Sequence, residues 1–352
     1  MMSLTLSDGY VLDTSGPYPG SKNDAQIVEH ITKVSEHLAQ WCGNDAVAIV
    51  DRGFDRVRTV FEDLRLIVKM PAFLTSKQHS WEEANQSRLI TKVRCAGEMY
   101  PDRLKKFLLF YQTIPNSLFE KIAPCVKIAS AALICFRPPL ISSVDPKKEE
   151  RLAKIMKIRA DAENELKERV LENPFNSRCK WDKLEDTQIA FPKMTKEQLR
   201  DLCFGTYQIK QARRYTEAHL NKNDGDYEVQ VTKHSDTILR CKIDSRHSSS
   251  TQYYCWIEYK LGDDDEQESS SESDDSSNED DDDDEYTLVT RFYKKLPIKS
   301  WYSQCPTGER SCGCCAHITC VLWYLCYARH HQFTPSKYTE RYRQTVDNME
   351  TD

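Results

Sequence analysis

The stretch AVAIVDRGFD, residues 46–55, decides the fold of the first part of this 352-residue chain. It opens with a short apolar, β-branched run, which is typical of a strand buried on both faces, and Asp51 ends the run. Residues 54–64 have the apolar spacing of a helix, and residues 66–70 return as a second strand that ends before Pro71. The pattern predicts a β-α-β unit. Asp51 would lie at the carboxyl end of a central strand, where open α/β sheets hold ligands and metals.

Glu98 is the second carboxylate of interest, and it lies in NQSRLITKVRCAGEMYPDRLKK, residues 85–106. The pattern is helical from Trp81 onward, with apolar residues interleaved among many Arg and Lys. Two carboxylates from separate elements inside a basic surface are what a Mg²⁺ or Mn²⁺ site for phosphodiester chemistry requires. Asp51 and Glu98 are therefore candidate catalytic and metal-binding residues. The alternative is that Asp51 caps the next helix and Glu98 is one exposed charge among many.

The segments VDRGFDRV, VKMPAFL and SRLITKVRCAGEMYPDRLKKF resemble the second half of the catalytic domain of Harbinger-like DDE transposases. The resemblance covers residues 8–136 and implies a partial α/β domain with an RNase H-like fold, a mixed sheet flanked by helices. On this match Asp51 is the second Asp of the catalytic trio and Glu98 is its Glu, and the family also carries an acidic residue at the place of Asp24. The first Asp belongs on a strand further upstream, so we expect it to be missing if Met1 is the true start.

The net charge of −6 hides a strong segregation of charge. Residues 263–285 hold 15 acidic residues and no Lys or Arg, so the rest of the chain carries a net charge of +9. Because this segment has almost no apolar residue to bury, we expect it to be disordered. It is either a solvated insertion in a loop or a polyanion that competes with nucleic acid for the basic surface.

The fourteen cysteines fall into two groups. Eight are scattered singly, Cys255 among them, and are expected to be reduced, buried thiols. The other six crowd into 22 residues, which in an intracellular chain points to metal: Cys305, Cys312, Cys314, Cys315, Cys320 and Cys326. Cys315 and His317 stand at the start of an apolar helix, and Cys305 precedes Cys315 by ten residues. Thiolate and imidazole are the ligands that structural Zn²⁺ prefers, so this spacing predicts a zinc site.

The spacing of Cys305, Cys315 and His317 resembles the SWIM-type zinc finger, in which Cys-x-Cys is followed by Cys-x-His at a helix start. The first Cys of that pattern is Ser303 here, and a neutral hydroxyl is a poor zinc ligand. Either three ligands of the pattern remain, or the fourth comes from the neighbouring cysteines, Cys312 or Cys314. The alternative is that all these cysteines are hydrophobic core residues.

Composition divides the chain into further segments. After the partial domain at 1–140, a charged helix with a thin apolar stripe is typical of an exposed connector. Alternating patterns then predict antiparallel strands, the last of them YTLVTRFYKKL at 286–296. The remaining predicted segments are a helical linker at 141–175, an α+β module at 176–262, the disordered acidic insert at 263–285, the end of the module with the zinc finger at 286–335, and a tail at 336–352.

Two classes of function compete. The chain is either a transposase-derived, catalytically incomplete protein that binds DNA or another nucleic acid, with a protein partner for its zinc module, or an active DDE endonuclease that uses Mg²⁺ or Mn²⁺. The first Asp missing from the trio favours the first class for this polypeptide. No apolar run approaches a membrane span, and the start lacks the features of a secretory signal. We expect an intracellular, nuclear protein.

Overall fold

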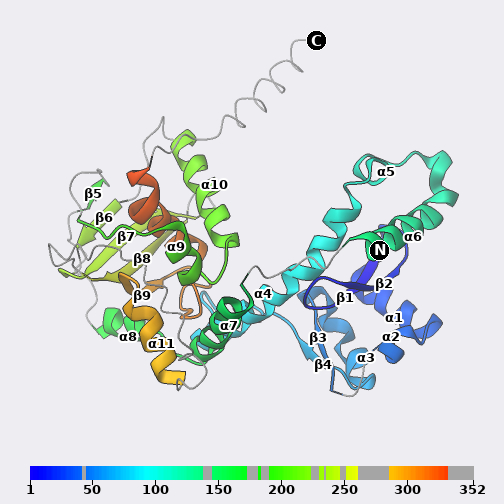
Figure 1. Ribbon diagram of the computed structural model, residues 1–352, viewed down its shortest axis with the longest axis horizontal. Helices are drawn as coiled ribbons and strands as arrows, with labels where there is room; N and C mark the ends of the chain where they lie inside the picture. Colours follow the sequence, from blue (N-terminus) through cyan, green and yellow to red (C-terminus); the bar gives the residue numbers. More distant parts are fainter. Residues whose placement is uncertain are drawn as a thin grey trace, which may run out of the picture. The chain divides into compact units, whose positions relative to one another are not determined.

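The computed structural model describes residues 1–41, 45–137, 145–172, 181–183, 190–222, 230–233, 235–245, 251–260 and 285–331. The chain forms two compact units (Figure 1). The first comprises Met1–Phe73 and Gln86–Glu150, and the second comprises Leu74–Asn85 and Arg151–Asp352. The predicted acidic insert, apart from Glu285, and the predicted tail lie outside the described residues. No helix in the described ranges has the length and apolar character needed to cross a membrane.

Two small sheets hold the strands of the first unit. β1 (Met2–Thr5) is antiparallel to β2 (Val11–Ser15), and β3 (Val47–Ile49) is parallel to β4 (Ile67–Lys69). Helices η1 (Arg52–Val57) and α3 (Arg58–Asp63) connect β3 to β4, which confirms the β-α-β unit.

The prediction that β3 is buried on both faces is wrong, because Val47 is 55% exposed. Within the described part of the chain, β3 has β4 as its one partner strand in a two-stranded sheet. A strand in so small a sheet has few neighbours to cover it, although its composition is that of a buried strand.

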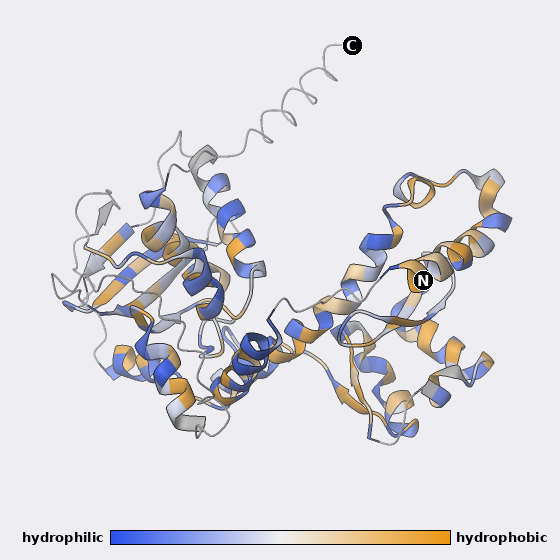
Figure 2. Cartoon of the chain, viewed as in Figure 1, coloured by the Kyte–Doolittle hydropathy of each residue, from blue (hydrophilic) through white to orange (hydrophobic). Residues whose placement is uncertain are grey.

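The helices of the first unit are α1 (Asp24–Val34), α2 (His37–Trp41), most of α4 (Trp81–Leu104), α5 (Leu108–Tyr111), η2 (Asn116–Leu118) and α6 (Phe119–Phe136). α1 begins at a capping box, in which the side chains of Asn23 and Gln26 each bond the backbone amide of the other. Its inner face places Val28 in a core with Val57 and Phe61 of the β-α-β connection. Figure 2 shows α6 as largely hydrophobic. This agrees with the second core of the unit, in which Val126 and Ala129 of α6 pack with Leu104.

A five-stranded antiparallel sheet, in the order β5-β6-β7-β8-β9, forms the centre of the second unit. Its strands are β5 (Asp182–Lys183), β6 (Gln230–Lys233), β7 (Ile238–Asp244), β8 (Gln252–Tyr259) and β9 (Ile298–Ser303). β6, β7 and β8 confirm the strands predicted from alternation. In β7, for example, Leu239, Cys241 and Ile243 are buried and the residues between them are not fully buried.

The helices around this sheet are α9 (Lys196–Leu202), α10 (Tyr207–Lys222), α11 (Glu285–Lys294), α12 (Ala316–Leu322), η3 (Trp323–Tyr327) and η4 (Ala328–His330). α11 corrects the strand predicted for residues 286–296. Leu288 and Phe292 are both buried, and their spacing of four residues lies on one face of a helix. The next strand after the acidic insert is β9.

The predicted exposed linker is instead two helices, α7 (Pro146–Ala160), which belongs to the second unit from Arg151 onward, and α8 (Glu165–Glu172). Both look hydrophilic in sequence, and α7 is largely blue in Figure 2, yet Ile155 and Leu166 are fully buried. The Asn164 side chain lies between the helices and donates hydrogen bonds to the carbonyls of Trp301 (2.9 Å) and Glu309 (3.0 Å). The thin apolar stripe is therefore a packing face, because a narrow stripe is enough for a helix that contacts a core on one side.

Candidate functional site

Asp51 and Glu98 lie close together in the first unit, and Arg94 connects them. Asp51 follows β3 and caps η1, where its side chain accepts a hydrogen bond from the Arg52 amide at 2.8 Å. Glu98 is on α4, one turn after Arg94. The Arg94 Nη1 atom lies 2.7 Å from Glu98 Oε1 and 3.3 Å from Asp51 Oδ2. The structure thus brings the two predicted carboxylates together, and a guanidinium that the sequence analysis did not single out lies between them.

Asp24 lies beside the same turn. It is the first residue of α1, and its Oδ2 atom would lie 3.4 Å from a Cβ placed on Gly53, two residues after Asp51. Three carboxylates from three elements therefore surround the start of η1. These carboxylates are not gathered as closely as metal ligands can be. Among the described residues, the three ligand atoms that lie within 4.8 Å of one another belong to a cysteine and histidine group in the second unit.

The carboxylates are accessible: Asp51 is 55% and Glu98 is 62% exposed, whereas Arg94 is 27% exposed. Carboxylate oxygens are the ligands that Mg²⁺ and Mn²⁺ take, and Mg²⁺ keeps several waters of its own, so two carboxylates fit a hydrated ion. A divalent cation at this place must compete with Arg94. Exposed ion pairs contribute about 1 kcal/mol or less, so the guanidinium is a weak barrier to such exchange.

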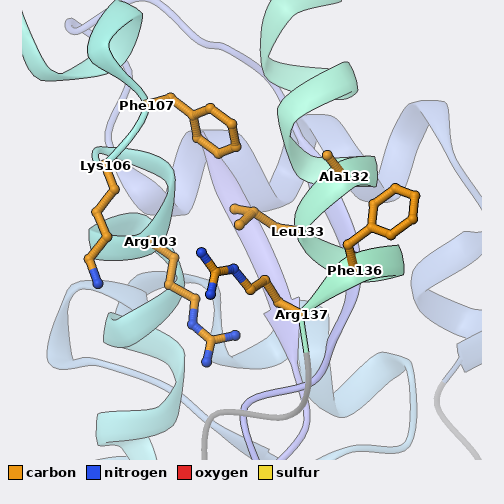
Figure 3. Close-up of a pocket in the computed structure, with 7 residues that line it drawn as sticks. All are labelled: Arg103, Lys106, Phe107, Ala132, Leu133, Phe136 and Arg137. Atoms are coloured by element: carbon orange, nitrogen blue, oxygen red, sulfur yellow. The ribbon is translucent and has the colours of Figure 1, made fainter.

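A pocket of about 370 Å³ opens between the end of α4 and α6 (Figure 3). Figure 3 shows the side chains of Arg103, Lys106 and Arg137 extending at one end of it, with Phe107 and Leu133 above them. The pocket is thus lined by cationic groups beside apolar surface. Cationic groups bind phosphate, and aromatic rings stack on bases, so the lining has the chemistry of a nucleic-acid contact.

A comparison with protein families gives a match in the first part of the chain. Residues 1–134 match the family model of the DDE superfamily endonucleases. The DDE domain includes the three carboxylates and Arg94, and the pocket lies at its end. This family implies DNA as the bound macromolecule and Mg²⁺ or Mn²⁺ as the cofactor. No curated protein and no solved structure matches the chain.

The cysteine and histidine group of the second unit consists of Cys305, Cys315 and His317, whose ligand atoms all lie within 4.8 Å of one another. Cys305 is in the loop after β9, and Cys315 caps α12, where its Sγ accepts a hydrogen bond from the Ile318 amide at 3.4 Å. Neither ring nitrogen of His317 has a hydrogen-bond partner among the described residues, although both are buried. Buried polar atoms without partners are rare, so this ring is suited to a metal ligand.

The thiols of this group differ in acidity. Burial alone raises the pKa of the Cys315 thiol, but the adjacent Cys305 thiol and His317 ring outweigh burial and hold this pKa well below its usual value. The hydrogen bond to Cys315, together with burial, raises the pKa of Cys305. A buried thiol whose ionisation is favoured by its neighbours, beside a second thiol and an imidazole, offers the donor set that Zn²⁺ takes in structural sites.

Residues just before α4 hold the ligand loop, which we define as the loop between β9 and α12 that carries Cys305. The Gln78 side chain donates hydrogen bonds to the carbonyls of Ser303 (2.6 Å) and Cys305 (2.8 Å), and the His79 amide donates to the Pro306 carbonyl at 3.0 Å. These bonds satisfy carbonyls of a buried loop, which would otherwise be costly to bury. They fix the backbone on both sides of Cys305.

Cys312 and Cys314, predicted as sources of a fourth ligand, are not in this group. The Cys312 Sγ lies 3.5 Å from the Met156 carbonyl, to which it donates. The Cys314 thiol faces Cys203, and burial together with that neighbour raises its pKa. Both are fully buried and therefore resemble the core cysteines of the alternative reading.

A different cysteine lies next to the group. Cys255 on β8 is opposite Ser303 in the β8–β9 register, and its Sγ is 3.4 Å from the Ser303 Oγ. Burial raises the pKa of the Cys255 thiol, and the nearby Cys315 raises it further. From the sequence, Cys255 is expected to be a single buried thiol. The sequence marks Cys255 only as a residue of an alternating strand. Its partner strand β9 begins more than forty residues later, so no motif of fixed spacing identifies Cys255 as a neighbour of the group.

Proposed function

We propose that this chain is a transposase-derived DNA-binding protein whose second unit is stabilised by zinc. The observation that carries the proposal is the Asp51–Arg94–Glu98 arrangement inside a DDE domain. The two carboxylates share one guanidinium, and the single positive charge of Arg94 offsets part of their negative charge. A divalent cation has to displace Arg94 here, and the nearby carboxylates are not gathered as closely as the cysteine and histidine group, so we expect binding rather than cleavage. As a DNA-binding protein it would act in the nucleus.

DNA contact is assigned to the cationic pocket of the DDE domain. Its three cations come from the end of α4 and from the residue after α6, next to the exposed Phe136 ring. Cations that neutralise phosphates give binding that weakens as salt increases. An exposed aromatic side chain beside them can stack on an unpaired base or pack against a sugar.

A second candidate is a metal-dependent endonuclease, which the position of Asp24 favours. Asp51, Glu98 and Asp24 would hold the divalent cation, whose chemistry is to activate the attacking oxygen and stabilise the leaving one. Arg94 would then leave the carboxylates and could contact a DNA phosphate instead. In this candidate Asp24 takes the place of a third acidic ligand.

The zinc part of the proposal rests on Cys305, Cys315 and His317. The burial of the two cysteines and the mutual distances of the three ligand atoms fit a structural ion. The second unit gains order from such an ion because it ties the end of β9 to the start of α12. The unpartnered nitrogens of His317 are the feature that a core role for these residues leaves without explanation.

Two assays on the full chain test the function. Fluorescence anisotropy with labelled duplex DNA measures binding, and conversion of supercoiled plasmid to nicked circles in Mg²⁺ or Mn²⁺ measures cleavage. We expect binding without nicking. Metal-dependent nicking that is lost in Asp51→Asn and Glu98→Gln variants would establish the second candidate instead. Absence of DNA binding at low salt would contradict both.

A further inference from the structure

The group Cys305, Cys315 and His317 supplies three ligands, whereas structural zinc sites are closed by four. Ser303 is fully buried at the end of β9, and its Oγ accepts a hydrogen bond from the Cys305 amide at 3.3 Å. A neutral hydroxyl is a poor partner for Zn²⁺. The fourth position therefore calls for another soft donor close to Ser303.

Cys255 meets that requirement by its place in the sheet. It is fully buried, it faces Ser303 across the β8–β9 ladder, and its Sγ lies 3.4 Å from the Ser303 Oγ. Tyr253, two residues earlier on the same face of β8, has its ring centroid 4.9 Å from that of His317. This face of β8 is thus directed at the histidine of the group. The thiol lies beside the hydroxyl that the Cys305 amide contacts.

We propose that Cys255 is the fourth zinc ligand and completes a Cys₃His site with Cys305, Cys315 and His317. This inference rests on the proposed binding of zinc. The fourth thiolate then comes from β8, whereas the other three ligands lie between the end of β9 and the start of α12. Ser303, beside Cys255, supplies a hydroxyl that can hydrogen-bond to the sulfur of Cys255. On binding, thiols release their protons to solvent and coordinate as thiolates. The site would then join β8, β9 and α12.

Cys241 provides a matched control. It is fully buried and pairs directly with Cys255 across the β7–β8 ladder, so it lies on the same face of the sheet. It is also one strand further from β9, and neighbouring strands are about 4.8 Å apart. Cys241→Ser therefore makes the same side-chain change as Cys255→Ser, but at a residue that is not a proposed zinc ligand.

The test uses the full chain purified from zinc-supplemented medium, with zinc per chain measured by mass spectrometry and sulfur ligands counted by X-ray absorption. We expect one zinc bound to three sulfurs and one nitrogen. Cys255→Ser should leave two sulfurs on the zinc. Loss of a residue that only hydrogen-bonds to a ligand weakens metal binding about 10–100-fold, and we expect a larger loss of zinc affinity here. Cys241→Ser should retain both the count and the affinity.

If the Cys255→Ser protein does not fold, a rescue variant still tests the role of Cys255. Adding Ser303→Cys to Cys255→Ser places a thiol on the adjacent side chain, and we expect it to restore three sulfurs. Wild-type protein with zinc on only two sulfurs, or equal zinc loss in Cys241→Ser and Cys255→Ser, would overturn the role of Cys255 while zinc binding stands. Wild-type protein without zinc would overturn the proposed zinc site as well.

Discussion

Gly308, in the loop that carries Cys305, has no room for a side chain. A Cβ placed there would lie 2.0 Å from the Ser303 carbonyl oxygen, and the Ser303 amide donates a hydrogen bond to the Gly308 carbonyl at 3.1 Å. We predict that Gly308→Ala lowers the free energy of unfolding by about 1–3 kcal/mol, since overpacking forces the backbone to move. It should also weaken zinc binding, because the same loop carries Cys305.

Chemical denaturation and a zinc competition assay measure these effects. Gly20→Ala is the matched control, because nothing lies within 4 Å of a Cβ at Gly20. A Gly308→Ala protein with the stability and the zinc affinity of the Gly20→Ala protein would show that the close approach to Ser303 is not required.

Arg94 competes with a metal ion for the carboxylates of Asp51 and Glu98. We predict that Arg94→Gln tightens Mn²⁺ binding to the DDE domain a few-fold, because exposed ion pairs of this kind contribute about 1 kcal/mol or less. Arg94→Lys keeps a cation and should change little. Electron paramagnetic resonance of free Mn²⁺ gives the affinity. Unchanged affinity in Arg94→Gln, or a gain that persists after Asp51→Asn, would mean that Asp51 and Glu98 do not form a cation site.

The position of a residue in an element could be predicted where it depends on neighbouring residues. Asp51 ends a strand and Glu98 lies on a helix, and both features follow from neighbouring residues. Arg94 as their shared partner depends on how α4 packs near η1, and the neighbourhood of Cys255 and Ser303 depends on strand register. Neither arrangement is encoded in local spacing, so the candidate sites were found only in part.

At the scale of elements, the capping boxes of α1 and α9 offer a direct stability test. The Thr195 Oγ1 accepts a hydrogen bond from the Gln198 amide at 3.1 Å, and Gln198 Oε1 accepts one from the Thr195 amide at 2.9 Å. We predict that Thr195→Ala costs about 1 kcal/mol of the free energy of unfolding. Thr195→Ser should lose little, since it keeps the hydroxyl. Urea unfolding measures both, and equal losses in the two variants would exclude the cap as the cause.

Elements with strict alternation were predicted from the sequence, as β6–β8 show. The errors arose where packing decides. Residues 286–296 contain β-branched and aromatic residues that suit a strand, but burial of Leu288 and Phe292 on one face makes α11 a helix. α7 and α8 have a charged composition, and only contact with the second unit shows that Ile155 and Leu166 belong to its core.

At the scale of the whole molecule, the two units should respond differently to loss of zinc. We predict that a zinc chelator increases hydrogen exchange in β9 and α12 and leaves α1 and α3 of the DDE domain unchanged, because the ligands belong to the second unit alone. Hydrogen exchange with mass spectrometry resolves these segments. Equal effects in both units, or none in either, would contradict a structural zinc site in the second unit.

The central claim, that the DDE domain binds DNA through its cationic pocket, is tested most directly by the salt dependence of duplex DNA binding. The variant Arg103→Gln, Lys106→Gln, Arg137→Gln should bind more weakly, and its slope of log affinity against log salt should be about 2–3 smaller, since each lost phosphate contact removes about 0.9. A matched variant removes three exposed cations of the second unit, Lys157, Lys193 and Lys210, and should keep the larger slope. The same slope and affinity in wild type and the pocket variant would contradict the claim.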